Sequence, residues 1–218
     1  MSNFKRLAAV LALLSGLAVF SYGETYYSFS VGVLRLSEIF TKEDYGRTLT
    51  GANISFAFLY APEESPWGVF SQTSLFTPSL TTEWKGTQMN TLDYSEAWDL
   101  RISAAPAYTF RLGKKTKIPV SCGPVLIVDW DNYWDEQTST NKYYEAWGMG
   151  MLLDGSFIIS PEKRFFIRSG ISYGFDFLHT ERGKQKSKYR AASGVRLAAV
   201  PYVASSLSVF LGIGLSFD

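Results

Sequence analysis

The sequence is poor in the residues that build disulfides and metal centres. Its 218 residues include one cysteine, Cys122, and one histidine, His179. A single cysteine excludes an internal disulfide and any CxxC redox or metal motif. A single histidine argues equally against a zinc site built from histidines. We therefore expect no metal site and no cofactor.

Charge is scarce and balanced as well. Charged residues make up 19% of the chain and the formal net charge is +1, against about a quarter charged residues in an average soluble domain. A chain with this balance has no bulk electrostatic attraction for nucleic acid. Nucleic-acid binding is therefore not expected.

Long hydrophobic runs are confined to the beginning of the chain. Lys5 and Arg6 precede an unbroken apolar and small-residue run over residues 7–20, and Ser21-Tyr22-Gly23 offers small residues at the −3 and −1 positions of a cleavage site. This pattern predicts a secretory signal peptide over 1–23 and a mature chain over 24–218. An uncleaved anchor is the alternative, but the run is shorter than the roughly 20 residues that a spanning helix needs. No later stretch reaches 18 apolar residues, so no transmembrane helix is expected.

Aromatic residues, at 16%, and glycines, 18 in all, are abundant and follow a regular alternation. In the segment 164–177, "RFFIRSGISYGFDF", one face is apolar and carries Phe165, Ile167, Ile171, Tyr173, Phe175 and Phe177. The other face carries Arg168, Gly170, Ser172, Gly174 and Asp176. A period of two residues predicts a β-strand with two unlike sides.

Similar alternation recurs along the mature chain and predicts about eight strands, near residues 27–33, 48–60, 67–77, 98–112, 118–130, 147–159, 164–177 and 207–217. The run 67–77 fits least well. Short connections such as "APEESPW", "GKKTK" and "SPEKR" alternate with longer polar ones such as "DNYWDEQTSTNKYYEA". This is the plan of an all-β, antiparallel, up-and-down transmembrane barrel. Residues 191–206 fit either an ordered loop or a long continuation of the last strand.

The direction of the apolar face separates two kinds of barrel. A soluble, lipocalin-like barrel turns its polar face to water and its apolar face to a ligand cavity. Here the apolar faces carry large side chains, whereas the polar faces are mostly Gly, Ser and Ala, which suit a narrow lumen. We therefore expect the apolar faces to contact lipid, with Trp98, Trp130, Trp147 and Phe217 at the membrane interfaces. The lipid-facing Pro106 and Pro124 should then lie near bulges or strand ends, because proline lacks a ladder donor.

The polar faces also carry charges of both signs, which this arrangement places in the lumen: Asp99, Arg101, Arg111, Asp129, Asp154, Arg168 and Asp176. Charges removed from water are tolerated chiefly as hydrogen-bonded pairs. One interpretation is a salt-bridge plug that holds the barrel rigid, and the other is a charged constriction for small solutes. The sequence leaves open which Asp meets which Arg.

Together these features resemble the small outer-membrane barrels of the OmpA, OmpX and OmpW type. The C-terminal segment "FLGIGLSFD" is similar to the assembly signal of such barrels, with Gly212, Leu215 and Phe217 in its characteristic places. It departs from the pattern where Phe210 replaces a polar residue and where Asp218 follows the terminal aromatic. The resemblance implies a bacterial outer-membrane location, contact with outer-membrane lipid and recognition by the barrel-assembly machinery.

Two segments raise the question of a more specific site. Some eight-stranded barrels are lipid A-modifying enzymes with a His, a Ser and an acid near the outer mouth, but Glu181 stands where the nucleophile would follow His179. We therefore expect no catalytic residues.

The segment "ERGKQKSKYR" places Lys184, Lys186, Lys188 and Arg190 on alternate residues. This basic outer loop is either a solvated loop or a surface for anionic headgroups, host polyanions or a protein partner.

The sequence thus predicts a non-enzymatic integral outer-membrane barrel. Its first predicted role is a narrow porin-like or OmpW-like conduit for small solutes. Because OmpW-like barrels pass small hydrophobic molecules, the resemblance extends this role to hydrophobic solutes. The alternative is a surface adhesin or membrane-integrity barrel that acts through its outer loops and binds a host surface ligand.

Overall fold

The computed structural model describes residues 23–40, 45–85, 88–92, 96–113, 115–135, 140–160, 164–185 and 202–217. Its strands are β1 (Glu24–Phe40), β2 (Tyr45–Ala61), β3 (Trp67–Lys85), β4 (Gln88–Leu92), β5 (Glu96–Arg111), β6 (Thr116–Asp135), β7 (Thr140–Ile159), β8 (Phe165–Gln185) and β9 (Tyr202–Phe217). Across these ranges no helix has the length and apolar character needed to cross a membrane.

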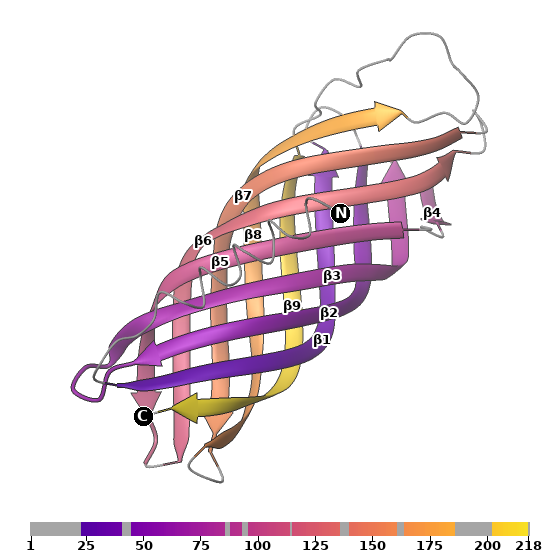
Figure 1. The fold of residues 1–218 in the computed structure, drawn as a ribbon. Coiled ribbons are helices and arrows are strands. Elements are labelled where there is room, and N and C mark those ends of the chain that lie inside the picture. Colours follow the sequence, from indigo (N-terminus) through magenta and orange to yellow (C-terminus); the bar gives the residue numbers. More distant parts are fainter. Residues whose placement is uncertain are drawn as a thin grey trace, which may run out of the picture.

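The strands form one antiparallel sheet that closes on itself. Strands that follow one another in sequence lie side by side, and β1 pairs with both β2 and β9. The short β4 and β5 share one position in the sheet, next to β3. The first half of β3 pairs with β5, and the end of β3 pairs with β4. The barrel therefore has eight strand positions, which confirms the predicted all-β up-and-down barrel. Figure 1 shows the strands winding obliquely around the barrel.

The two ends of the barrel differ. The start of β1, the end of β9 and the connections β2–β3, β5–β6 and β7–β8 lie together at one end, here called the turn end (Figure 1). The strand ends joined by the other five connections lie toward the opposite end, here called the loop end. In outer-membrane barrels, short turns face the periplasm and long loops face outward.

The strands are longer at the loop end than the sequence predicted. The segment 131–146, predicted as part of a polar loop, instead forms paired strand from Asp129↔Ala146 to Asp135↔Thr140. The predicted loop after β3 likewise contains the β3–β4 hairpin. Within 191–206, strand β9 begins at Tyr202, and residues 191–201 lie outside the described part. A strand with polar residues at both inward and outward positions shows no period-two hydrophobic signal, which explains the missed extensions.

Two prolines interrupt the ladder between β5 and β6. Pairing passes directly from Ser103↔Val125 to Ala107↔Ser121, and Pro106 and Pro124 both lie in this gap. A Cβ added at Gly123 would lie 2.6 Å from the Cβ of Ala105, so the strands approach closely there. The expectation that these prolines lie at a ladder irregularity agrees with this placement, because neither residue has an N–H to donate.

Candidate functional site: the barrel lumen and its outer belt

The outward faces of the strands form a belt of exposed apolar side chains, here called the apolar belt. On β7 it runs from Trp147 to Ile159, and on β9 from Leu207 to Phe217; all four side chains are 43–56% exposed. At 3.3 Å per residue and a strand tilt of about 40°, these 11–13 residues span roughly 25–30 Å. This height matches the hydrocarbon-facing band of an outer-membrane barrel.

Aromatic side chains mark both edges of the apolar belt. Trp98 and Trp147 lie at its loop-end edge, 46% and 56% exposed. At the turn end, Tyr108 packs edge-on against Trp67, with ring centroids 5.1 Å apart, and Phe217 is 51% exposed. Such girdles suit the interfaces of a bilayer. The side chain of Trp130 lies outside the described residues.

The lumen holds larger side chains than the sequence predicted. Beside the expected serines, its buried apolar residues include Tyr26, Phe70, Phe76, Phe166 and Phe210. The small residues expected in the lumen do point inward, but the aromatic side chains among them were not predicted. These aromatics stand next to outward-facing apolar residues in sequence, as in Phe165-Phe166 and Val209-Phe210-Leu211, so the alternation was hidden.

An arginine on β5 organises the first charged network of the lumen. Arg101 donates from Nε to both carboxylate oxygens of Asp99, at 3.0 and 2.9 Å, and from Nη2 to Asp99 Oδ2 at 2.8 Å. Across the lumen, Arg101 Nη2 reaches Asp176 Oδ2 on β8 at 3.1 Å and Nη1 reaches Ser206 Oγ on β9 at 2.8 Å. Gly174 leaves room for the guanidinium, because an added Cβ would lie 3.2 Å from Nη1. This network crosses the barrel from β5 to β8 and β9.

A second network lies nearer the turn end. Arg168 on β8 donates to Asp154 Oδ1 at 2.7 Å and to Ser156 Oγ at 3.1 Å, both on β7. Its guanidinium carbon also lies 4.5 Å from the ring centroid of Phe210 and 5.0 Å from that of Phe70. Asp154 and Arg168 are each 2% exposed. The cation is therefore held between a carboxylate and two aromatic faces, which stabilise it away from water.

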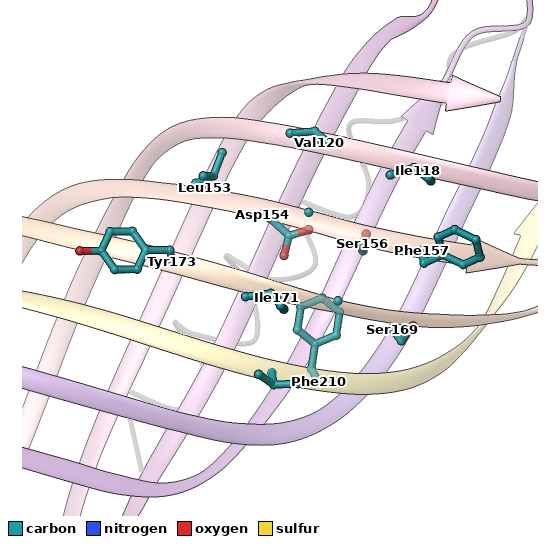
Figure 2. A pocket seen from close by; sticks show the side chains of 13 residues that line it. Ile118, Val120, Leu153, Asp154, Ser156, Phe157, Ser169, Ile171, Tyr173 and Phe210 are labelled. Atoms are coloured by element: carbon teal, nitrogen blue, oxygen red, sulfur yellow. The ribbon is translucent and has the colours of Figure 1, made fainter. Parts of the chain in front are cut away.

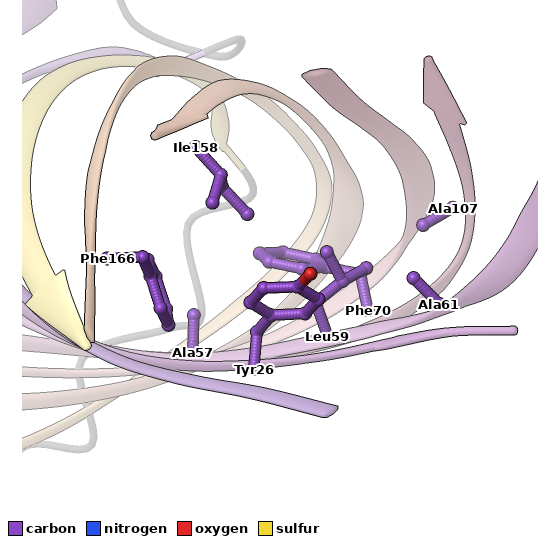
Figure 3. Close-up of a cluster of buried hydrophobic side chains, with 8 residues drawn as sticks. All are labelled: Tyr26, Ala57, Leu59, Ala61, Phe70, Ala107, Ile158 and Phe166. Atoms are coloured by element: carbon purple, nitrogen blue, oxygen red, sulfur yellow. The ribbon is translucent and has the colours of Figure 1, made fainter. Parts of the chain in front are cut away.

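At the turn end, the lumen contains a third set of hydrogen-bonded polar side chains and an apolar cluster. Lys117 on β6 forms an ion pair with Glu24 at the start of β1 and donates to the hydroxyl of Tyr26, and that hydroxyl donates to Glu24 Oε2 at 2.7 Å. Above it, Tyr26 meets Phe166 edge-on, with ring centroids 5.3 Å apart. Figure 3 shows the full cluster: Tyr26, Ala57, Leu59, Ala61, Phe70, Ala107, Ile158 and Phe166.

Toward the loop end, a further apolar cluster lies next to the Arg101 network, because Phe76 is paired with Asp99 and Ala204 with Asp176. It consists of Leu34, Leu36, Leu49, Phe76 and Ala204. Glu38 lies beyond it on β1 and is 1% exposed. The lumen is thus filled by side chains at two levels, with hydroxyl and amide groups such as Asn53 and Ser208, bonded at 3.1 Å, between them.

The structure places six of the seven charges predicted for the lumen inside the barrel. Asp99, Arg101, Asp129, Asp154, Arg168 and Asp176 are all buried. Arg111 is a correction: it is exposed at the turn end, where it donates to the carbonyl oxygens of Ser65, at 3.3 Å, and Pro62. It occupies the last position of β5, beyond the point where the lumen is covered. Lys117, in contrast, was missed because it follows directly on a lysine-rich turn.

The remaining predicted residues fall in different places. In β9, Gly212 points inward and lies against Ser30, while Leu215 and Phe217 point outward, each 51% exposed. Lys184 belongs to β8, but its side chain is outside the described residues. Lys186, Lys188 and Arg190 also lie outside them. The backbone of His179 pairs with Gly148, and its side chain is likewise not described.

Comparison with known proteins identifies the fold but no closer relationship. No protein-family model matches the chain, and no curated protein matches it in sequence. The structure of OprG from Pseudomonas aeruginosa aligns with a TM-score of 0.58 and 11% identity over 90% of this chain and 97% of that chain. A major outer-membrane protein from Thermus thermophilus gives 0.54 and 16% over 88% and 99%. The chain thus has the barrel fold of small outer-membrane proteins.

The protease OmpT from Escherichia coli aligns with a TM-score of 0.47 and 6% identity over 91% of this chain and 98% of that chain. Likeness of fold does not show an activity, so function has to be argued from the lumen and the surface.

Proposed function

We propose that this chain is a non-enzymatic bacterial outer-membrane barrel with a sealed lumen, acting through the part that rises beyond the apolar belt. The observation that carries the proposal is the double seal of the lumen. The Arg101 network and the cluster around Phe76 fill it toward the loop end. Arg168, Phe166 and their neighbours fill it toward the turn end.

The membrane location is supported by the apolar belt itself. A soluble protein rarely exposes contiguous apolar patches larger than a few hundred Å², whereas this barrel exposes large apolar side chains on strands all around its wall. Every strand of a closed barrel has its backbone groups paired by a neighbour, as hydrocarbon requires. Both features favour a barrel that spans the outer membrane.

The seal argues against an open axial conduit. Near the turn end, a cavity of about 10 Å³ remains between Phe58, Phe166 and Arg168, which is about the space of one water molecule. Passage of a larger solute along the axis would require displacing buried ion pairs from their partners, which is strongly unfavourable in a low-dielectric interior. The salt-bridge plug is therefore the better account of the lumen charges.

The strands that extend beyond the apolar belt form the surface through which the barrel would act. Beyond Trp147, β7 continues for seven residues to Thr140, and beyond Phe177, β8 continues for eight to Gln185. These lengths correspond to roughly 18–20 Å at the same rise and tilt. A paired sheet of this height, which the basic segment 184–190 continues in sequence, suits adhesion to an anionic surface or lateral support of the outer membrane.

Two measurements test the proposal. The purified barrel in planar bilayers should give no single-channel currents; regular currents would instead favour the narrow conduit. In cells, loss of the protein should either reduce binding to an anionic matrix or increase sensitivity to detergents. Trimming the β6–β7 hairpin over 133–142 should then abolish the binding role but leave the integrity role unchanged.

A further inference from the structure

The wall of the barrel carries a depression of about 690 Å³ on its lipid-facing side (Figure 2). Nine of its thirteen lining residues occupy outward positions of β6, β7, β8 and β9. Gly155 is one of the lining residues, and a Cβ added there would meet no heavy atom within 4 Å. Phe157, Ile171 and Tyr173 also line the depression and are 38–54% exposed. A volume of this size is in the range of small-molecule sites.

The ladder is interrupted beside the depression. Pairing between β6 and β7 passes from Lys117↔Ile158 to Val120↔Gly155, so Ile118 and Pro119 have no paired residue on β7 in the described ladder. Pro119 has no N–H to donate. On the β8 side, the outward residue next to Phe157 is the small Ser169. The hollow therefore follows from the sequence, through one glycine, one serine and one proline.

The depression lies in the turn-end half of the apolar belt. Gly155 is four residues from the end of β7 at Ile159, which places it roughly 10 Å above the belt edge. In the proposed membrane location, this half contacts the periplasmic leaflet. What surrounds the depression there is the acyl region of phospholipids, and the depression is continuous with the rest of the lipid-contacting surface.

Two described residues at the edge of the belt below the depression are basic. Lys115, in the β5–β6 turn, and Arg164, directly before β8, are both exposed. The two turns that flank β6 and β7 are held together by a hydrogen bond from Ser160 N to the carbonyl oxygen of Lys115 at 2.8 Å. By contrast, the β2–β3 turn on another part of this edge exposes Glu63 and Glu64.

We infer that this part of the wall is a phospholipid site. An acyl chain occupies the depression over Gly155, and the headgroup phosphate of the same lipid lies against Lys115 and Arg164. The fit is one of shape and of charge, because the hollow is apolar and the edge below it is positive. Basic side chains at a membrane surface attract anionic headgroups. The inference rests on the proposed membrane location, since the depression is otherwise a surface exposed to water.

Lipid retention measures the site directly. The full mature chain is reconstituted into vesicles of palmitoyl-oleoyl phosphatidylglycerol and phosphatidylethanolamine, extracted in mild detergent and examined by native mass spectrometry. We expect one retained phospholipid per barrel, with phosphatidylglycerol preferred. Gly155→Phe, which fills the hollow, should lower this retention at least fivefold, and Gly155→Val serves if the first variant folds poorly. The matched control, Ala52→Phe, places the same ring on the outward face of β2 and should retain lipid.

The headgroup contact is tested separately. Lys115→Gln and Arg164→Gln should each weaken the preference for phosphatidylglycerol roughly fivefold. Arg35→Gln, which removes an exposed cation from β1, should leave it unchanged. Equal retention by the wild type and Gly155→Phe would overturn the inference. So would equal loss in Gly155→Phe and Ala52→Phe, or a wild-type dimer that Gly155→Phe converts to monomer, because the wall would then be an interface between copies.

Failure of the membrane location looks different from failure of the lipid site. If the mature chain stays folded and soluble without detergent, the proposed function is wrong and the lipid experiment no longer applies. If the chain shows the boiling-dependent gel shift of a membrane barrel but retains no lipid, only the site is wrong.

Discussion

The guanidinium of Arg168 lies over the face of Phe210, with 4.5 Å between its central carbon and the ring centroid. Phe210 is the residue that departs from the polar position of the C-terminal assembly pattern. Its ring points into the lumen and is 4% exposed. The aromatic residue at this position therefore contributes to the salt-bridge plug, because its ring covers a buried cation that Asp154 neutralises.

This relationship gives a first prediction. Phe210→Ser restores the usual polar residue but removes the ring from Arg168 and leaves a cavity, so it should lower the free energy of unfolding by about 3–5 kcal/mol. Equilibrium urea unfolding in phospholipid vesicles measures the change. Val209→Ser, on the outward face of the same strand, controls for loss of an apolar group. Unchanged stability in Phe210→Ser would mean that the ring does not support the plug.

The Arg168–Asp154 pair gives a second prediction. Arg168→Met leaves Asp154 buried without its cation, which should destabilise the barrel by about 3–5 kcal/mol. Replacing both partners, as Arg168→Met with Asp154→Leu, should recover most of this loss, because an apolar pair of similar volume carries no buried charge. The same unfolding assay compares the three proteins. A double variant as unstable as the single one would show that the pair is not the source of the effect.

The fold could be predicted from sequence wherever the two faces of a strand meet different surroundings. From Trp147 to Ile159, one face of the strand forms part of the apolar belt and the other faces the lumen. A period of two residues therefore appears in the sequence, and the predicted strand position is correct. The same contrast distinguishes Asp154 and Arg168 as inward residues. It fails at the loop end of β6 and β7, where the sequence is polar without a period of two residues and looks like a loop.

The content of the lumen was harder to predict. Phe166 and Phe210 each follow an outward apolar residue, so an unbroken apolar run conceals the fact that one of its members points inward. Pairing across the barrel, such as Arg101 with Asp176, depends on strand tilt and stagger. These quantities are properties of the closed sheet and are not encoded in any one strand.

The double seal gives a third prediction. Arg101→Ser with Phe76→Ala opens the level toward the loop end, and Arg168→Ser with Phe166→Ala opens the level toward the turn end. Each of these two variants should remain silent in planar bilayers, because the other level still blocks the lumen. The variant with all four substitutions should conduct ions. Val209→Ala, on the outward wall, is the control and should remain silent; currents from the wild type would contradict the sealed lumen.

Two glycines on the wall give a fourth prediction, because they differ in what surrounds them. An added Cβ at Gly212 would lie 2.4 Å from the carbonyl oxygen of Phe29 and 2.1 Å from Ser30 Oγ, whereas one at Gly155 meets nothing within 4 Å. Gly212→Ala should therefore cost about 1–3 kcal/mol of stability through overpacking. Gly155→Ala should be neutral or stabilising by about 0.5–1 kcal/mol, since strand interiors disfavour glycine. Equal effects at the two positions would argue against the close approach of β1 and β9.

The apolar belt gives the last prediction, which decides whether the belt contacts lipid or water. Leu211 and Leu207 both point outward on β9, 59% and 47% exposed, but Leu211 lies six residues from the turn end and Leu207 ten. In a membrane, arginine at the midplane costs about 2–4 kcal/mol and arginine near the interface about 0–1 kcal/mol. Leu211→Arg should therefore be much less stable than Leu207→Arg in phospholipid vesicles. In a soluble barrel both positions would face water and both substitutions would be nearly neutral, so equal and small effects would exclude the membrane-spanning arrangement.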